Sequence, residues 1–211
     1  MPDISSLLAY GLISLGMVLT PGPNMIYLIS RSICQGRTAG LISLGGVALG
    51  FLIYMVCAAL GITALVMAVP LAYDVLRFGG ALYLVYLAWQ AVKPGGSSPF
   101  QVRDLPKDSP RKLFTMGVVT NLLNPKVAVM YLSLLPQFIE PNGHGSVLLQ
   151  SLVLGSLQIF ISVSVNAVIA CMAGSIAVFF VTRPGWQVVQ RWVMGSVLMG
   201  LAVRMAVEGR K

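Results

Sequence analysis

Two motifs that combine proline with polar residues lie inside apolar stretches of the sequence. The first consists of Thr20, Pro21, Gly22, Pro23 and Asn24. Proline has no backbone N–H, so Pro21 and Pro23 would leave two carbonyl groups of the preceding helix without partners. Pro23 also suits the first position of a new helix, whose free amide groups and partial positive charge attract a carboxylate. With Gly22 permitting a sharp bend, the motif predicts a helix break that binds a carboxylate.

The second motif contains Asn121, Asn124, Pro125 and Lys126 in the order N-L-L-N-P-K. Asn124 can cap a helix that begins at Pro125, and the carbonyl that this proline frees belongs to Asn121. Lys126 adds a full positive charge beside the same helix start. A lysine at the centre of a membrane helix costs about 2.5–3.5 kcal/mol on insertion scales, so we interpret Lys126 as functional. A lysine that only anchors the helix at the interface is the alternative.

The composition predicts a protein that lipid surrounds. Of 211 residues, 57% are hydrophobic and only 9% are charged, whereas roughly 25% is usual for a soluble domain. The formal charge is +8, but the basic residues lie between the apolar stretches and form no stripe. We therefore expect them to anchor a membrane protein and predict no binding of nucleic acid.

Six apolar stretches predict an all-α integral membrane protein with six transmembrane helices. They cover residues 4–30, 40–69, 75–91 or 78–91, 113–135, 146–173 and 192–207. The fifth stretch continues without charge to residue 182, where it could become an interfacial helix. Residues 1–211 form one membrane domain in this interpretation. A polar linker, 93–112, divides it into a first half, 1–92, and a second half, 113–211.

Each half contains three spans, so the two halves are predicted to be inverted repeats, with helices one and four broken by the prolines. Lys and Arg gather on the side of the linker, which places the linker in the cytoplasm and both termini in the periplasm. If helix one were re-entrant, five spans would remain and the N-terminus would be cytoplasmic. Counted from Arg31 and Lys112 at about 1.5 Å per residue, both breaks lie near the middle of the bilayer. Matching broken helices are typical of a transporter's central site.

Further residues suggest contacts within the membrane. Gln158 and Asn166 could line the same cavity or form hydrogen bonds between helices, and both interpretations stay open. Tyr54 is a further candidate for the cavity lining. Gly46 and Gly50 have the spacing that lets two helices approach closely. The sequence contains no P-loop and only one histidine, His144. We therefore predict no enzyme activity, no metal site and no cofactor.

The order of the motifs resembles the LysE/RhtB family of amino-acid exporters over nearly the whole chain. The shared motifs are T-P-G-P-N from Thr20, Q-G-R-T-A-G from Gln35, G-G-A-L-Y-L from Gly79, N-P-K from Asn124 and L-P-Q-F from Leu135. The resemblance implies secondary active export of amino acids or close derivatives across the bacterial inner membrane, driven by the proton gradient. Homoserine, homoserine lactone, threonine and other small neutral amino acids are the implied substrates.

The resemblance also makes the two proline motifs the functional core. Where many members carry a histidine in helix two, this chain has Tyr54, so a proton route through that position is not expected. Our hypothesis is that both helix starts and Lys126 hold the carboxylate of an amino acid, while Asn24, Asn121 and Asn124 bind its other polar groups. A passive channel and a non-transporting subunit of a membrane complex are the alternatives. Lipid is the expected neighbour, and a homo-oligomer stays open.

Overall fold

The computed structural model describes residues 2–20, 22–62, 70–93, 107–140, 145–182 and 184–207, and all regular secondary structure in them is helical. The elements are α1 (Ile4–Leu19), α2 (Pro23–Gln35), α3 (Arg37–Cys57), η1 (Ala58–Ile62), α5 (Pro70–Val92), α6 (Pro110–Leu122), α7 (Pro125–Val129), η2 (Met130–Leu134), η3 (Leu135–Phe138), α8 (Val147–Thr182) and α9 (Pro184–Val207). Pro21, His144 and most of the predicted linker, 94–106, lie outside the described residues.

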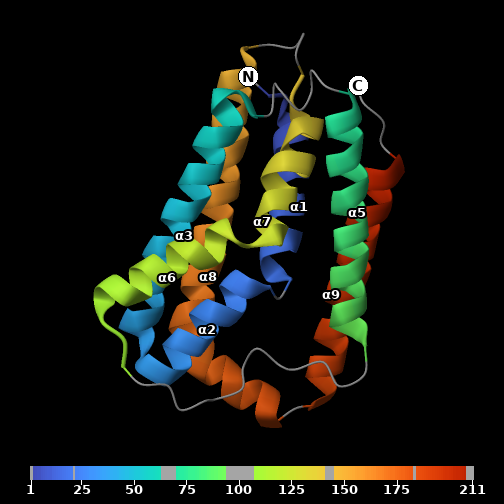
Figure 1. Ribbon diagram of the computed structural model, residues 1–211. Helices are drawn as coiled ribbons and strands as arrows, with labels where there is room; N and C mark the ends of the chain where they lie inside the picture. The colour runs from blue at the N-terminus through green and yellow to red at the C-terminus, as the bar shows by residue number, and fades with distance from the viewer. Residues whose placement is uncertain are drawn as a thin grey trace.

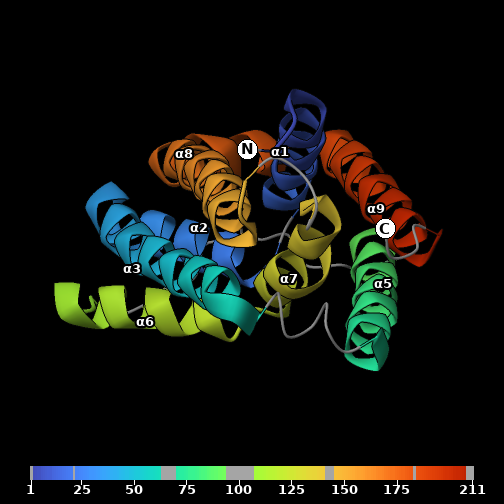
Figure 2. The ribbon, with the colours of Figure 1, turned by 90° about the horizontal axis from the view of Figure 1, so that it is seen from above.

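The helices form a bundle in which successive segments run in opposite directions (Figure 1). α1 with α2 descends in this view, α3 returns, α5 descends, α6 with α7 returns, and α8 and α9 complete the order. The start of α1 and the end of α9 therefore lie at one end, and the end of α5 and the start of α6 lie at the other. Seen from above, α1 and α7 lie between the α5–α9 pair and the group formed by α2, α3, α6 and α8 (Figure 2).

Several of these segments are suited to cross a membrane. Among the described residues, Arg37–Gly61 and Val147–Ser175 are each long and apolar enough to form a span. α1 with α2, and α6 with α7 through η3, satisfy the same criterion as pairs that bend by 51° and 50°. By length and composition, the described residues therefore contain two candidate spans, or up to four if each bent pair is one span. The predicted breaks in helices one and four are confirmed.

Two helices begin earlier than predicted. α5 starts at Pro70, before residue 75, and α9 starts at Pro184, before residue 192. The prediction began each helix where charged residues gave way to apolar ones, but a charged residue does not end a helical backbone. Proline is tolerated in the first turn of a helix, so Pro70 and Pro184 are compatible with the helical residues that follow them.

Apolar side chains cover much of the surface, and polar side chains lie inside. Large apolar side chains that are at least 65% exposed include Leu8, Leu12, Leu82 and Phe160. Amide and hydroxyl side chains are buried, among them Ser43, Asn121, Asn124, Gln158 and Asn166. Lipid tails are as apolar as leucine, so such a surface is stable in a bilayer, whereas water would disfavour it. This distribution agrees with the membrane location that the composition predicts.

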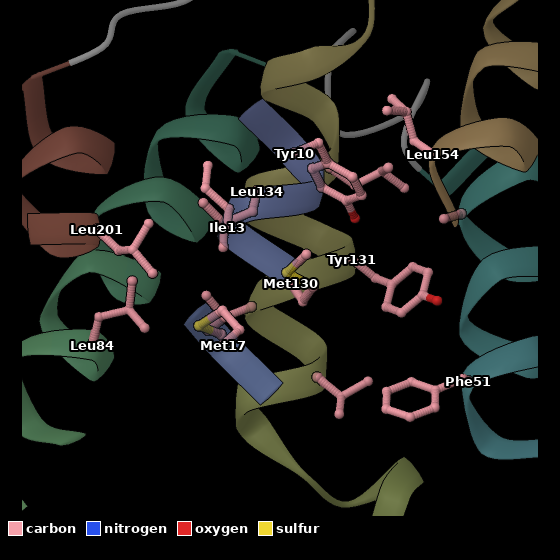
Figure 3. Packing of buried hydrophobic residues seen from close by; sticks show 14 of the residues in the cluster. Tyr10, Ile13, Met17, Phe51, Leu84, Met130, Tyr131, Leu134, Leu154 and Leu201 are labelled. Atoms are coloured by element: carbon pink, nitrogen blue, oxygen red, sulfur yellow. The ribbon is translucent and has the colours of Figure 1, made fainter. Parts of the chain in front are cut away.

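The core gathers around α1 and the helical segment that begins with α7 (Figure 3). Tyr10 and Met17 of α1 and Tyr131 of η2 belong to one cluster at the centre. Leu84 of α5 lies on one side of it and Phe51 of α3 on the other. The π-helical turn of η2 precedes Pro136, whose missing N–H interrupts the regular α-helical hydrogen bonds. These contacts hold the two broken helices at the centre of the bundle.

Glycines bring α3 into close contact with α6. A Cβ at Gly46 would overlap the backbone oxygen of Phe114, and a Cβ at Gly117 would overlap the backbone oxygen of Ser43. Gly50 lies against Asn121, where an added Cβ would come within 2.6 Å of the asparagine Cβ. The predicted packing role of Gly46 and Gly50 is confirmed, and it places the second broken helix directly on α3.

A polar network that the sequence did not reveal joins the end of α2 to the start of α6. The Asp108 carboxylate binds Arg31 Nη1 at 2.5 Å and Lys112 Nζ at 2.6 Å. Gln35 donates to the same carboxylate at 3.0 Å and accepts from the Asp108 N–H at 2.8 Å. Hydrogen bonds from Lys112 and Gln35 hold the pKa of Asp108 below its usual value. The network therefore holds the end of α2 against the start of α6 at this end of the bundle.

We expect Asp108→Asn to lower the melting temperature of the detergent-solubilised protein at neutral pH. The pKa of this carboxyl is lower in the folded state than in the unfolded state, where it is about 3.9. The carboxylate therefore stabilises the fold fully above that value and loses its contribution as the pH falls through the folded-state pKa. Melting curves across this range should show the gap between wild type and variant closing in acid.

Glu140→Gln is the matched control, because the Glu140 side chain is exposed, and it should leave the melting temperature unchanged. A deficit in Asp108→Asn that stays equally large in acid would contradict an ionic role for Asp108.

Candidate functional site

The break between α6 and α7 is built by its own residues. Asn124 Oδ1 accepts a hydrogen bond from the Lys126 N–H at 3.0 Å and so caps α7, which begins at Pro125. The carbonyl of Asn121 accepts from the Asn124 N–H at 3.0 Å. The predicted cap is confirmed. This cap starts a new helix, α7, after α6 has ended at Leu122, and Lys126 lies in the first turn of α7.

The break between α1 and α2 leaves carbonyl groups facing the interior. α1 ends at Leu19, Thr20 is extended, and α2 begins at Pro23 after the extended residue Gly22. Thr20 Oγ1 donates to the Gly16 carbonyl at 2.8 Å, which fixes the last turn of α1. Because the helix stops here, the carbonyls of its final turn can accept hydrogen bonds from elsewhere.

Lys126 joins the two breaks. Its Nζ donates to the Met17 carbonyl at 2.8 Å and to the Thr20 carbonyl at 2.6 Å. Gly22 leaves room for this approach, because an added Cβ would lie 3.1 Å from Nζ. Lys126 is only 9% exposed, and within the described residues no carboxylate pairs with it. The positive charge is therefore held by the negative end of α1.

A cavity of about 30 Å³ adjoins Lys126. Its lining is mixed: Asn24, Lys126, Gln158, Ser162 and Asn166 are polar, and Met17, Val18, Met25, Phe51, Val127 and Met130 are apolar. This volume holds one or two water molecules. A ligand larger than this could enter only if the helices around the cavity moved apart.

Four of the predicted site residues line this cavity: Asn24, Lys126, Gln158 and Asn166. Of the others, Gly22 lies against Lys126, Thr20 supplies a carbonyl to it, and Asn124 caps its helix. Pro23 and Pro125 are exposed at the helix starts, and Pro21 lies outside the described residues. The two motifs, about 100 residues apart in the sequence, are thus brought together.

Asn121 and Tyr54 serve the second break rather than the cavity. Tyr54 OH donates to the Leu122 carbonyl at 2.9 Å, and its ring stacks on Tyr131 with centroids 5.6 Å apart. Tyr54 thus binds the end of α6 as Lys126 binds the end of α1. Asn121 is fully buried against Gly50. The sequence analysis missed Ser162, whose spacing of four residues from both Gln158 and Asn166 could have revealed it.

The structure thus places a buried lysine between two broken helices, beside a cavity lined by polar and apolar side chains. The family model of the LysE type translocator matches residues 15–209. The chain belongs to this family of LysE type translocators.

Similar proteins agree with this assignment. The homoserine/homoserine lactone efflux protein of Salmonella typhimurium is 32% identical over 170 residues, which cover 80% of this chain and 81% of that protein. The uncharacterized membrane protein YrhP of Bacillus subtilis is 30% identical over 149 residues, covering 66% of this chain and 70% of YrhP. No solved structure matches the chain.

We expect Asn124→Ala to lower the free energy of unfolding by about 1 kcal/mol, because the Lys126 N–H loses its capping acceptor. Asn124→Ser keeps a side-chain oxygen at this position and is the matched control, with stability close to wild type. Denaturant unfolding in detergent measures both. Equal losses for the two variants would show that Asn124 acts through packing instead of capping.

Proposed function

We propose that this protein is a secondary active exporter of amino acids or their close derivatives across the bacterial inner membrane, driven by the proton gradient. Small neutral amino acids, homoserine and homoserine lactone are the proposed substrates. The observation that carries the proposal is Lys126, a buried cation that carbonyls of the opposite broken helix hold beside a cavity. Membership of the translocator family and the name of the Salmonella relative support it.

Lys126 would bind the carboxylate of an amino-acid substrate, or the ring carbonyl of the lactone, together with the helix starts of α2 and α7. A carboxylate forms stronger hydrogen bonds with an ammonium group than a neutral carbonyl does. Substrate would therefore replace the Met17 and Thr20 carbonyls as the partner of Lys126. The end of α1 would be released at the same moment, so empty and loaded proteins would differ in how tightly the two breaks are joined.

The proposed mechanism is alternating access by two inverted three-helix repeats, 1–92 and 113–211, with six spans. A twofold rotation that exchanges the two halves would superimpose α1–α2 on α6–α7, α3 on α8, and α5 on α9. The helix contacts fit this exchange: α5 packs on α9 and α3 packs on α8, while α3 packs on α6 as α8 packs on α1. These four contacts are then either repeated or mapped onto themselves, as a twofold relation requires.

The proposed orientation places the linker in the cytoplasm and the termini in the periplasm. Basic side chains cluster where α2 ends and α6 begins, including Arg31, Arg37, Arg111 and Lys112. Cytoplasmic ends of membrane helices collect such residues. Under this orientation the Asp108 network lies on the cytoplasmic side, where an exporter takes up its substrate.

Efflux from proteoliposomes tests the proposed function. We expect saturable efflux of a neutral amino acid that increases with a pH gradient, and a rate about tenfold or more lower in Lys126→Met, because one ionic contact to the carboxylate is lost. Lys107→Met removes an exposed lysine and is the matched control, with the wild-type rate. Efflux that ignores the pH gradient would indicate a passive channel. Absence of efflux for every amino acid would favour a non-transporting subunit.

A further inference from the structure

Three buried polar residues form a row along α8. Gln158, Ser162 and Asn166 follow one another at intervals of four residues, which places them on one face of the helix. All three are at most 4% exposed, and all three line the cavity beside Lys126. A membrane helix buries a polar row of this kind only where other protein groups or a ligand satisfy it.

Hydrogen bonds fix how this row faces the cavity. Tyr131 OH donates to Gln158 Oε1 at 2.6 Å, and Gln158 Nε2 donates to Ser162 Oγ at 2.8 Å. Asn166 Nδ2 donates to the Ser162 carbonyl at 2.8 Å. The only hydrogen-bond acceptor of the Asn166 side chain is its Oδ1. That oxygen is buried and has no partner.

A second acceptor without a partner lies on α2. Asn24 lines the same cavity, is 6% exposed, and its buried Oδ1 accepts no hydrogen bond. Burying an amide oxygen without a donor is unfavourable, so two such oxygens beside one cavity indicate a ligand that supplies donors. Lys126 does not satisfy them in this conformation, in which its Nζ binds two carbonyls of α1 and both amide oxygens stay without a donor.

The charges around the cavity decide which donor fits. Lys126 is its charged residue, and the described lining contains no carboxylate. A zwitterion can place its carboxylate on Lys126, but its ammonium must then be bound by neutral acceptors. A second ammonium on the side chain would meet a positively charged site and an apolar wall that includes Met17, Met25 and Phe51.

We propose that Asn24 and Asn166 form the subsite for the α-ammonium of the transported amino acid, and that this site rejects basic side chains. The proposal rests on the proposed function and extends it. Binding would bring α2 and α8 together through one ammonium group, while Lys126 on α7 holds the carboxylate. Both broken helices and α8 would then contact the same substrate molecule.

Three probes with a common four-carbon chain test the subsite in proteoliposomes. L-homoserine has the α-ammonium, 2,4-dihydroxybutanoate replaces it with a hydroxyl, and L-2,4-diaminobutanoate adds a basic side chain. We expect the wild-type protein to transport homoserine about tenfold or more faster than either analogue. Asn166→Leu and Asn24→Leu should slow homoserine about tenfold and leave the rate of dihydroxybutanoate nearly unchanged, so the discrimination disappears.

Two more variants complete the test. Asn166→Asp supplies a carboxylate and should raise the rate of diaminobutanoate relative to homoserine. Ser164→Ala changes an exposed residue of α8 and is the control, with wild-type rates. The proposal is overturned if Asn166→Leu slows homoserine and dihydroxybutanoate by the same factor while Asn166→Asp leaves the probe ratios unchanged. Wild-type protein that transports homoserine without preferring it to dihydroxybutanoate would refute the subsite alone, whereas failure to transport any amino acid would refute the proposed function as well.

Discussion

The structure depends on how a buried ammonium group is stabilised without a carboxylate among the described residues. Water would normally solvate Lys126, and removing it is costly. The end of α1 compensates, because its last carbonyls carry the negative end of the helix dipole and have no partners within their own helix. The cation of one half of the chain is thus bound by the broken helix of the other half, which keeps both breaks at the centre of the bundle.

Each surrounding feature makes this contact possible. Pro23 and Pro125 start new helices at the centre, and Gly22 leaves space for the lysine. Gly46 lets α3 lie directly on the backbone of α6, and Tyr54 binds the carbonyl at the end of that helix. A lysine inside a membrane helix is costly to bury, which supports the proposed role of Lys126 as the partner of an anion, and the translocator family supplies the class of function.

Much of the site could be predicted because proline acts locally. A proline in a helix interior removes a backbone hydrogen bond whatever surrounds it, so both breaks and the cap at Asn124 followed from the sequence. The partner of Lys126 did not follow, because the contact joins residues more than 100 positions apart. The Asp108 network was not predicted either, because Arg31 and Asp108 are also far apart in the sequence. The starts of α5 and α9 were placed late because charge was used to mark where a helix begins, and charge does not control backbone conformation.

In the proposed mechanism, Lys126 exchanges a carbonyl partner for the carboxylate of the substrate. Calorimetric titration of the detergent-solubilised protein with L-homoserine and with its carboxamide tests this exchange, because the two ligands differ only in that group, which is a carboxylate in one and a neutral amide in the other. We predict that wild type binds homoserine about tenfold or more tightly than the carboxamide and that Lys126→Met binds both equally. An unchanged preference for homoserine in Lys126→Met would contradict the account.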